Sequence, residues 1–126
     1  MKQSITSRKA PAAIGPYSQA IQTGSYLFLS GQLGINPETG MFVEGLVTEQ
    51  TGQVFKNIRA VLEEANLTLD NVVKTTVFLA DMGDFAAMNE VYARHFTEPY
   101  PARSAVAVKT LPKNALVEIE VIAAAI

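Results

Sequence analysis

Short segments of alternating polar and apolar residues predict β-strands in the first part of the chain and near its middle. Residues 18–22 alternate in this way, and the turn dipeptide Thr23-Gly24 separates them from the apolar segment 26–31, so a β-hairpin is expected. Residues 72–79 are rich in β-branched and aromatic side chains, which favour strands. Residues 34–40, after the second of these strands, are expected to form a loop, because Asn36-Pro37 and Thr39-Gly40 are typical of turns.

Two other segments carry apolar residues at helical spacing. The first runs from Thr48 to Ala65, with Thr48 as the expected N-cap and Asn66 in the left-handed position past its end. Its apolar face is predicted to be Phe55, Ile58, Leu62 and Ala65. The second runs from Phe85 to Phe96 and is expected to be capped by Asp84. Its apolar face is predicted to be Phe85, Met88, Tyr92 and Phe96.

The last third of the chain predicts two more strands, over 101–108 and 116–123, separated by the turn 111–114. The predicted order is therefore β-β-α-β-α-β-β. Each helix lies between strands, which favours a mixed sheet with both helices packed on one face. The expected fold class is α+β, in a single domain over residues 1–126.

The final strand predicts that both faces of the sheet are covered. Val117, Ile119, Val121 and Ala123 point to one side, which suits the helices. The other side receives Leu116, Glu118, Glu120 and Ile122, a mixture that fits a fully solvated face poorly. The strand at 26–30 also has apolar residues on both faces, with Leu27 and Leu29 on one and Tyr26 and Phe28 on the other. Since two helices cover one face, we expect the other to pack on another subunit, which places Glu118 at or near an interface.

The composition is that of an ordinary globular domain. With 126 residues, 48% of them hydrophobic, the chain is long enough to bury a core of its own. Its net charge of −2 provides no general attraction for nucleic acid or for an anionic membrane. Because it has neither an apolar leader segment nor a run of ~18 apolar residues, a soluble cytoplasmic protein is expected, with no membrane partner.

The use of cysteine and histidine limits the chemistry that the chain can perform. There is no cysteine, which excludes disulfides, thiolate metal sites and a cysteine nucleophile. The one histidine, His95, cannot build a metal site alone and is expected to be structural. We therefore expect the chain to need neither a metal nor a cofactor.

Arg103 and Glu118 are the residues best suited to bind and transform a small acid. Arg103 stands at the start of a predicted strand, after Pro101, and its planar guanidinium can donate two parallel hydrogen bonds to a carboxylate. If its strand neighbours that of Glu118, the two side chains would hold a small acid between them. On the residues alone, Arg103 is also compatible with a surface ion pair, and Glu118 with a partner for a lysine or an arginine.

Five motifs, in order, resemble those of one known family, the Rid family (YjgF, reactive intermediate deaminases). The similarity runs from about residue 8 to residue 124. The motifs are Ala10-Pro-Ala-Ala-Ile-Gly-Pro-Tyr-Ser-Gln-Ala, Ser30-Gly-Gln, Val73-Lys-Thr-Thr-Val-Phe-Leu, Pro101-Ala-Arg-Ser and Val117-Glu-Ile-Glu. The arginine of Pro-Ala-Arg-Ser makes the chain most similar to the imine-deaminating branch, because other branches often lack it.

The resemblance implies a chorismate-mutase-like α+β fold, assembled as a homotrimer with three clefts between subunits. It implies the hydrolysis of 2-iminobutanoate and 2-iminopropanoate to 2-oxo acids and ammonia, without a cofactor. The substrates are reactive imines, and their enamine tautomers, released by dehydratases that act on threonine or serine.

The resemblance also assigns roles to residues. Arg103 would bind the substrate carboxylate, and Glu118 would lie beside the attacking water as the catalytic acid and base. The cleft would be lined by Tyr17, Ser30, Gly31 and Asn89. Many family members have a cysteine where this chain has Ala105. Since the family uses chiefly the backbone there, Ala105 still counts as a substrate-binding position, while a thiol-based redox response is not expected.

Two other functions stay open at this stage. Some relatives are described as ribonucleases or translation inhibitors, but the net negative charge and the lack of a basic cluster with interleaved aromatics argue against RNA binding. The alternative is a non-catalytic protein that binds small 2-oxo or amino acids and regulates a partner. The same cleft would serve that role, and only turnover separates it from the enzyme.

Overall fold

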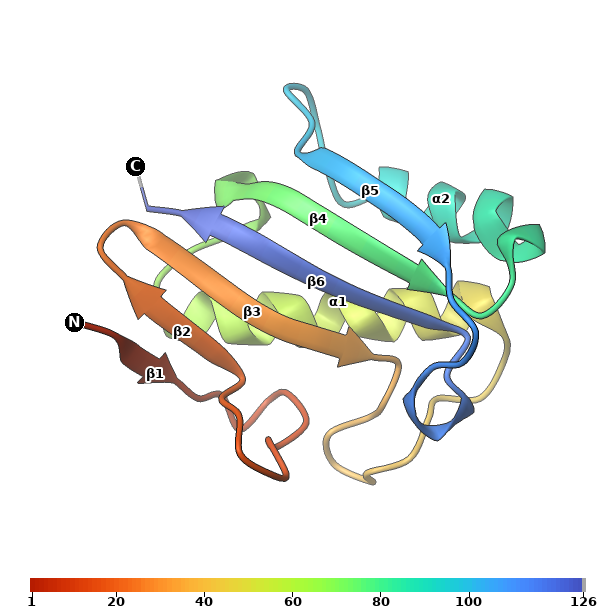
Figure 1. The fold of residues 1–126 in the computed structure, drawn as a ribbon, viewed down its shortest axis with the longest axis horizontal. Coiled ribbons are helices and arrows are strands. Elements are labelled where there is room, and N and C mark those ends of the chain that lie inside the picture. Colours follow the sequence, from red (N-terminus) through yellow and green to blue (C-terminus); the bar gives the residue numbers. More distant parts are fainter. Residues whose placement is uncertain (126) are drawn as a thin grey trace.

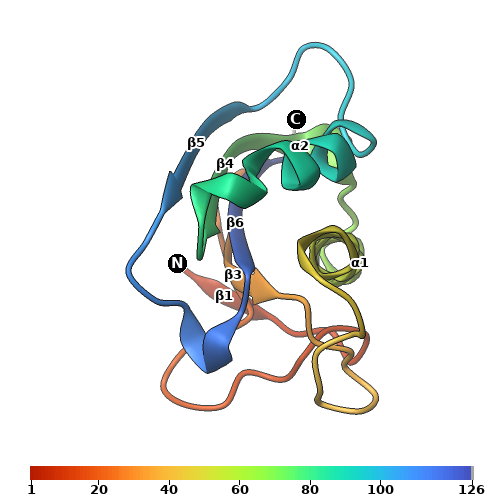
Figure 2. The same cartoon turned by 90° about the vertical axis from the view of Figure 1, so that its right-hand side faces the viewer.

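The computed structural model describes residues 1–125, which form a six-stranded mixed sheet with two α-helices packed on one side (Figures 1 and 2). The strands are β1 (Gln3–Ile5), β2 (Ala20–Thr23), β3 (Tyr26–Leu33), β4 (Val72–Leu79), β5 (Ala102–Ala107) and β6 (Val117–Ala124). The helices are α1 (Val47–Glu64) and α2 (Phe85–Ala93), and three short 3-10 turns are η1 (Leu69–Asn71), η2 (Met82–Asp84) and η3 (Pro112–Asn114). The predicted α+β class is confirmed.

The order of strands across the sheet is β1-β2-β3-β6-β4-β5. All neighbours are antiparallel except β4 and β5, which are parallel and are connected through α2. Parallel neighbours need a crossover, and a helix provides it. The last strand of the chain thus lies at the centre of the sheet, whereas β5 forms its edge (Figure 1).

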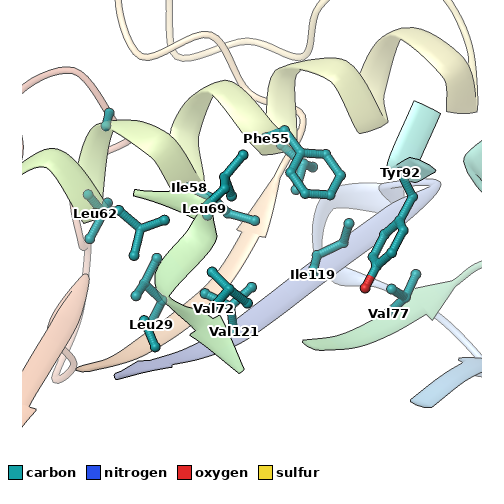
Figure 3. Packing of buried hydrophobic residues seen from close by; sticks show 14 of the residues in the cluster. Leu29, Phe55, Ile58, Leu62, Leu69, Val72, Val77, Tyr92, Ile119 and Val121 are labelled. Atoms are coloured by element: carbon teal, nitrogen blue, oxygen red, sulfur yellow. The ribbon is translucent and has the colours of Figure 1, made fainter. Parts of the chain in front are cut away.

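The core lies between the sheet and the helices, where the alternation in the sequence predicted it (Figure 3). Val117, Ile119, Val121 and Ala123 of β6 are all buried. From α1, the predicted residues Phe55, Ile58 and Leu62 meet them. Burial of these apolar side chains is the main force that holds α1 on the sheet.

The opposite face of the sheet carries exposed apolar side chains. Tyr26 is 51% exposed, Phe28 44% and Val106 46%. Their register partners on the neighbouring strands place them on the side away from the helices. The sequence predicted such a face from Tyr26 and Phe28, and its burial against another subunit stays a prediction.

Two details in the first half of the chain differ from the prediction. Strand β1 was not expected, because three residues are too few to show a pattern. Thr48 is not the N-cap of α1, since the helix begins at Val47, and the exposed N–H of Leu46 instead donates to the Glu49 carboxylate at 2.8 Å. Asn66, by contrast, has the expected left-handed backbone, with φ of 59°.

The second helix is shorter than predicted. It ends at Ala93, where the N–H groups of Arg94 and His95 donate to carbonyls three residues back and tighten the last turn. Phe96 lies past the helix but is still buried in the core. Asp84 precedes the helix without making a capping hydrogen bond through its side chain. Within residues 1–125, no helix combines the length and the apolar character needed to cross a membrane.

Candidate active site

A cleft of about 680 Å³ lies at the end of the sheet where β3 ends and β6 begins. Figure 1 shows the ends of these two strands. The loop before β2, the segment after β3 and the η3 turn border the cleft. It brings together four of the predicted site residues, Tyr17, Ser30, Gly31 and Glu118. Another cavity, of about 410 Å³ beside His95, contains none of them.

The loop that carries Tyr17 is held by the side chain of Gln19, which is only 3% exposed. The amide oxygen of Gln19 accepts a hydrogen bond from the Ser7 N–H at 2.6 Å, and its amide nitrogen donates to the Pro11 carbonyl at 2.7 Å. The backbone carbonyl of Gln19 accepts a hydrogen bond from the Ser30 N–H at 2.9 Å. One buried glutamine therefore joins the loop to β3, and sequence reasoning missed it.

An irregularity in β3 gives Glu118 its place. The register between β3 and β6 shifts around Ser30 and Gly31, and the Ser30 hydroxyl donates to the Ser18 carbonyl at 2.6 Å. A Cβ atom at Gly31 would lie 2.5 Å from Oε2 of Glu118. Because the Glu118 side chain would have to shift to make room for any side chain there, glycine leaves the space that the carboxyl group occupies.

The surroundings of Glu118 favour its protonated form. Burial raises the pKa of the Glu118 carboxyl, and the charge of Glu120 raises that pKa further. Glu118 has no cation to offset this, since the one ion pair found within residues 1–125 joins Arg94 to Glu90. A carboxyl group that keeps its proton to higher pH is suited to act as an acid and then, once ionised, as a base.

Arg103 lies in a separate set of side chains provided by α2. Its Nη1 donates to the Oδ1 of Asn89 at 2.6 Å. Its guanidinium carbon stands 4.7 Å from the centre of the Tyr92 ring and 5.4 Å from that of Phe85. Arg103 is exposed, as expected on the edge strand β5, and Ala105 follows on the same face of that strand.

Within one chain, Arg103 and Glu118 do not meet, so the expectation that their strands are neighbours is wrong. β4 lies between the two strands, with Thr75 paired to Arg103 and Phe78 paired to Glu118. An offset of three residues on a strand places the two side chains on opposite faces and about 10 Å apart along it. Thr75 faces the helices and is fully buried, so Arg103 lies on the helix side and Glu118 on the open side.

The predicted residues therefore form two half-sites. The acid half-site contains Glu118, Gly31, Ser30 and Tyr17, and the guanidinium half-site contains Arg103, Asn89 and Ala105. Sequence reasoning missed Lys113, which lines the cleft of the acid half-site with an unusual left-handed backbone, φ of 55°. It also took Tyr92 for a core residue alone, although its spacing from Phe85 and Asn89 places all three on one side of α2.

His95 belongs to neither half-site. Its ring stacks on Phe55 with centroids 4.2 Å apart. Burial lowers the pKa of His95, and the charges of Arg59 and Arg94 lower it further, which favours a neutral ring at the edge of the core. In the part of the chain that the structure describes, no three His, Cys, Asp or Glu side chains gather into a possible metal site.

Comparison with known proteins identifies the family. A family model described as Endoribonuclease L-PSP matches residues 7–125. A RutC family protein of Pyrococcus horikoshii is 55% identical over 123 residues, which cover 98% of each chain. The 2-iminobutanoate/2-iminopropanoate deaminase of Mus musculus is 48% identical over 98% of this chain and 91% of the mouse protein. The crystal structure of E. coli TdcF with bound serine is 40% identical and superimposes with a TM-score of 0.91 over 97% of this chain and 98% of TdcF.

The fold and the two half-sites are thus those of a small α+β protein with imine deaminases among its relatives. The chain belongs to the Endoribonuclease L-PSP family, which is the Rid (YjgF) family. The family resemblance drawn from the five motifs is confirmed.

Proposed function

We propose that this chain hydrolyses 2-iminobutanoate and 2-iminopropanoate to 2-oxo acids and ammonia. The observation that carries the proposal is the Glu118 carboxyl, which has a raised pKa and no cation partner within the described residues and lines a cleft that Gly31 keeps open. Such a group can move protons to and from the imine nitrogen of a small 2-imino acid. The name of the mouse relative, at 48% identity, supports the same substrates.

The complete site requires two copies of the chain. Arg103 and Glu118 lie on opposite faces of one sheet, and Arg103 is exposed on its edge strand. The open face exposes Tyr26 and Phe28, which a second copy would bury. In the proposed homotrimer, the guanidinium half-site of one subunit faces the acid half-site of the next, and three clefts result.

Arg103 and Glu118 would then have separate roles. The guanidinium binds the substrate carboxylate with two hydrogen bonds and so holds the imine carbon near Glu118. Fixed geometry of this kind can lower a reaction barrier by up to roughly 7–11 kcal/mol. Tyr17, Ser30 and Gly31 close the cleft around the short alkyl chain, and the backbone at Ala105 borders it from the Arg103 side.

Glu118 would move the protons of both steps. It first gives its proton to the imine nitrogen and takes one from the water whose oxygen bonds to the imine carbon, which produces a carbinolamine. It then gives the proton to the amino nitrogen. The C–N bond breaks, ammonia leaves, and the hydroxyl proton returns to Glu118 as the C=O bond forms. General acid–base catalysis of this kind typically contributes ~10²–10⁴-fold.

A coupled assay tests the proposal. Threonine dehydratase supplies the imine, semicarbazide traps it, and the protein is added. We expect less semicarbazone and faster formation of 2-oxobutanoate. Arg103→Ala should abolish both effects while the variant stays folded and keeps its oligomeric state. Unchanged activity in that variant would remove Arg103 from the mechanism.

Two other functions are separated by the same assay. TdcF is 40% identical and was crystallised with serine, which favours a binder of small amino or 2-oxo acids as the second candidate. Binding of 2-oxobutanoate without any turnover of the imine would support that role. An RNA-directed activity, which the family description suggests, would require binding that falls steeply with salt, and the net charge of −2 disfavours it.

A further inference from the structure

We propose that Tyr92 is a positioning residue that holds the Arg103 guanidinium in the orientation that grips a carboxylate. The ring of Tyr92 supports the face of the guanidinium, and a hydroxyl contact with buried Thr75 fixes that ring. This inference rests on the carboxylate-binding role proposed for Arg103.

The contacts of Arg103 leave its hydrogen-bonding edge free. The guanidinium carbon lies 4.7 Å from the Tyr92 ring centre, within the range of a cation–π contact. Asn89 accepts from one nitrogen only, Nη1, at 2.6 Å. A guanidinium has five N–H donors in one plane, so support of its face and one bond to Asn89 leave donors to form a pair of bonds with a carboxylate. Asn89 thus takes part in the site through Arg103.

The position of the Tyr92 ring is itself fixed by a contact with β4. Its hydroxyl lies 2.8 Å from the Thr75 hydroxyl, and the side chain of Tyr92 is only 6% exposed. The ring extends from α2 with its hydroxyl directed at β4 (Figure 3). Phe55 and Phe96 pack against the same ring, with centroids 5.8 and 4.9 Å away. A buried hydroxyl pair in this setting leaves the ring little freedom.

Thr75 is also the residue that pairs with Arg103 in the sheet. The backbone of Arg103 and the ring beneath its guanidinium are therefore both tied to the same position of β4. This matters because Arg103 is exposed on an edge strand, where a long side chain would otherwise sample many rotamers. A guanidinium that is already oriented loses less freedom when the carboxylate binds.

The test measures how strongly the protein prefers a carboxylate over a neutral analogue. Calorimetric titration with 2-oxobutanoate and with 2-oxobutanamide gives the ratio of the two affinities. We expect Tyr92→Leu to lower the preference for 2-oxobutanoate about tenfold, with little change for the amide. Tyr92→Phe, which keeps the ring but loses the hydroxyl contact with Thr75, should lower the preference by a smaller factor, about threefold, and an unchanged preference would remove Thr75 from the proposal. This milder variant keeps the test valid if the leucine variant folds poorly.

A double-mutant cycle separates positioning from a general structural role. In an Arg103→Ala background, Tyr92→Leu should cause no further loss of preference, because its effect passes through Arg103. Val91→Ala is the matched control, since Val91 is buried on the same helix but forms none of the contacts described for Arg103 or for the Tyr92 ring, and it should leave the preference unchanged.

Two failures of this experiment are distinguishable. If the wild type shows no preference for the carboxylate, the proposed role of Arg103 is wrong and the inference falls with it. If the wild type shows the preference and Tyr92→Leu retains it, or loses affinity for both ligands equally, only the positioning role of Tyr92 is overturned.

Discussion

The acid half-site and the guanidinium half-site are held by different physical means. Glu118 lies on the central strand β6, and its position depends on a backbone irregularity in β3 and on Gly31, where any side chain would require the Glu118 carboxyl to shift. Arg103 lies on the edge strand β5 and is held by side chains of α2. Because β6 is paired on both sides, its backbone has little freedom to compensate for a shift of the Glu118 carboxyl, whereas the stacked side chains around Arg103 can repack. Small changes near Glu118 should therefore cost more activity than comparable changes near Arg103.

The largest expected effect comes from mixing two inactive variants. Arg103→Ala lacks the group that binds the substrate carboxylate, and Glu118→Gln lacks the group that transfers protons. Each variant should therefore lose ~10² to 10⁴-fold in the rate of imine hydrolysis. If one chain supplies Arg103 and the next supplies Glu118, subunit exchange in an equal mixture should restore about a quarter of the wild-type activity. The semicarbazide assay before and after exchange measures the gain.

The control for this mixture is Arg103→Ala combined with the double variant Arg103→Ala/Glu118→Gln. That mixture has no intact guanidinium half-site and should regain nothing. A site completed inside a single chain would leave both mixtures inactive, and the proposed arrangement of two copies would then be wrong.

A smaller loss is expected from adding one methyl group beside Glu118. In Gly31→Ala the new Cβ would stand 2.5 Å from the carboxylate oxygen, so the carboxyl must shift. A displacement of about 1 Å at a reacting group costs on the order of 10²-fold in rate. Gly52→Ala is the matched control, because a Cβ there meets nothing within 4 Å, and it should keep full activity. Equal activities of the two variants would show that Glu118 has room to adjust.

The smallest effect concerns stability against pH. Because burial and Glu120 raise the pKa of Glu118 in the folded chain, this group contributes stability below its unfolded pKa and loses that contribution as pH rises through the folded pKa. The thermal midpoint of Glu118→Gln should therefore rise relative to that of the wild type as pH increases from about 4 to about 8. A constant difference across this range would contradict the raised pKa. Glu120→Gln should reduce the pH dependence, since Glu120 supplies part of the shift.

Local patterns were sufficient to predict most elements of the fold. Alternation along 117–123 assigned both faces of β6 correctly, and the helical spacing of Phe55, Ile58 and Leu62 identified the buried side of α1. The errors fall where local preference competes with the surroundings. Thr48 is a good capping residue by type, but α1 begins one residue earlier and Glu49 satisfies the Leu46 N–H instead.

The sequence named the residues of the candidate site but did not give their arrangement. The motifs identified Arg103 and Glu118 through family resemblance, and alternation placed Glu118 on the face away from the helices. Nothing in the order of residues revealed that β6 inserts between β3 and β4, or that β5 is left at the edge. Strand order depends on which long-range pairings bury the most apolar surface, and that is a property of the whole chain.

By itself, the sequence determined which side chains face the core and which residue types are available for chemistry, because the two-residue period of a strand and the 3.6-residue period of a helix are local properties. Only the tertiary structure decided that Arg103 and Glu118 lie on opposite faces, and that Tyr92 and Thr75 stand beneath the guanidinium. The physical reason is that register and strand order, which no short segment encodes, set the side and the neighbours of every residue in the sheet.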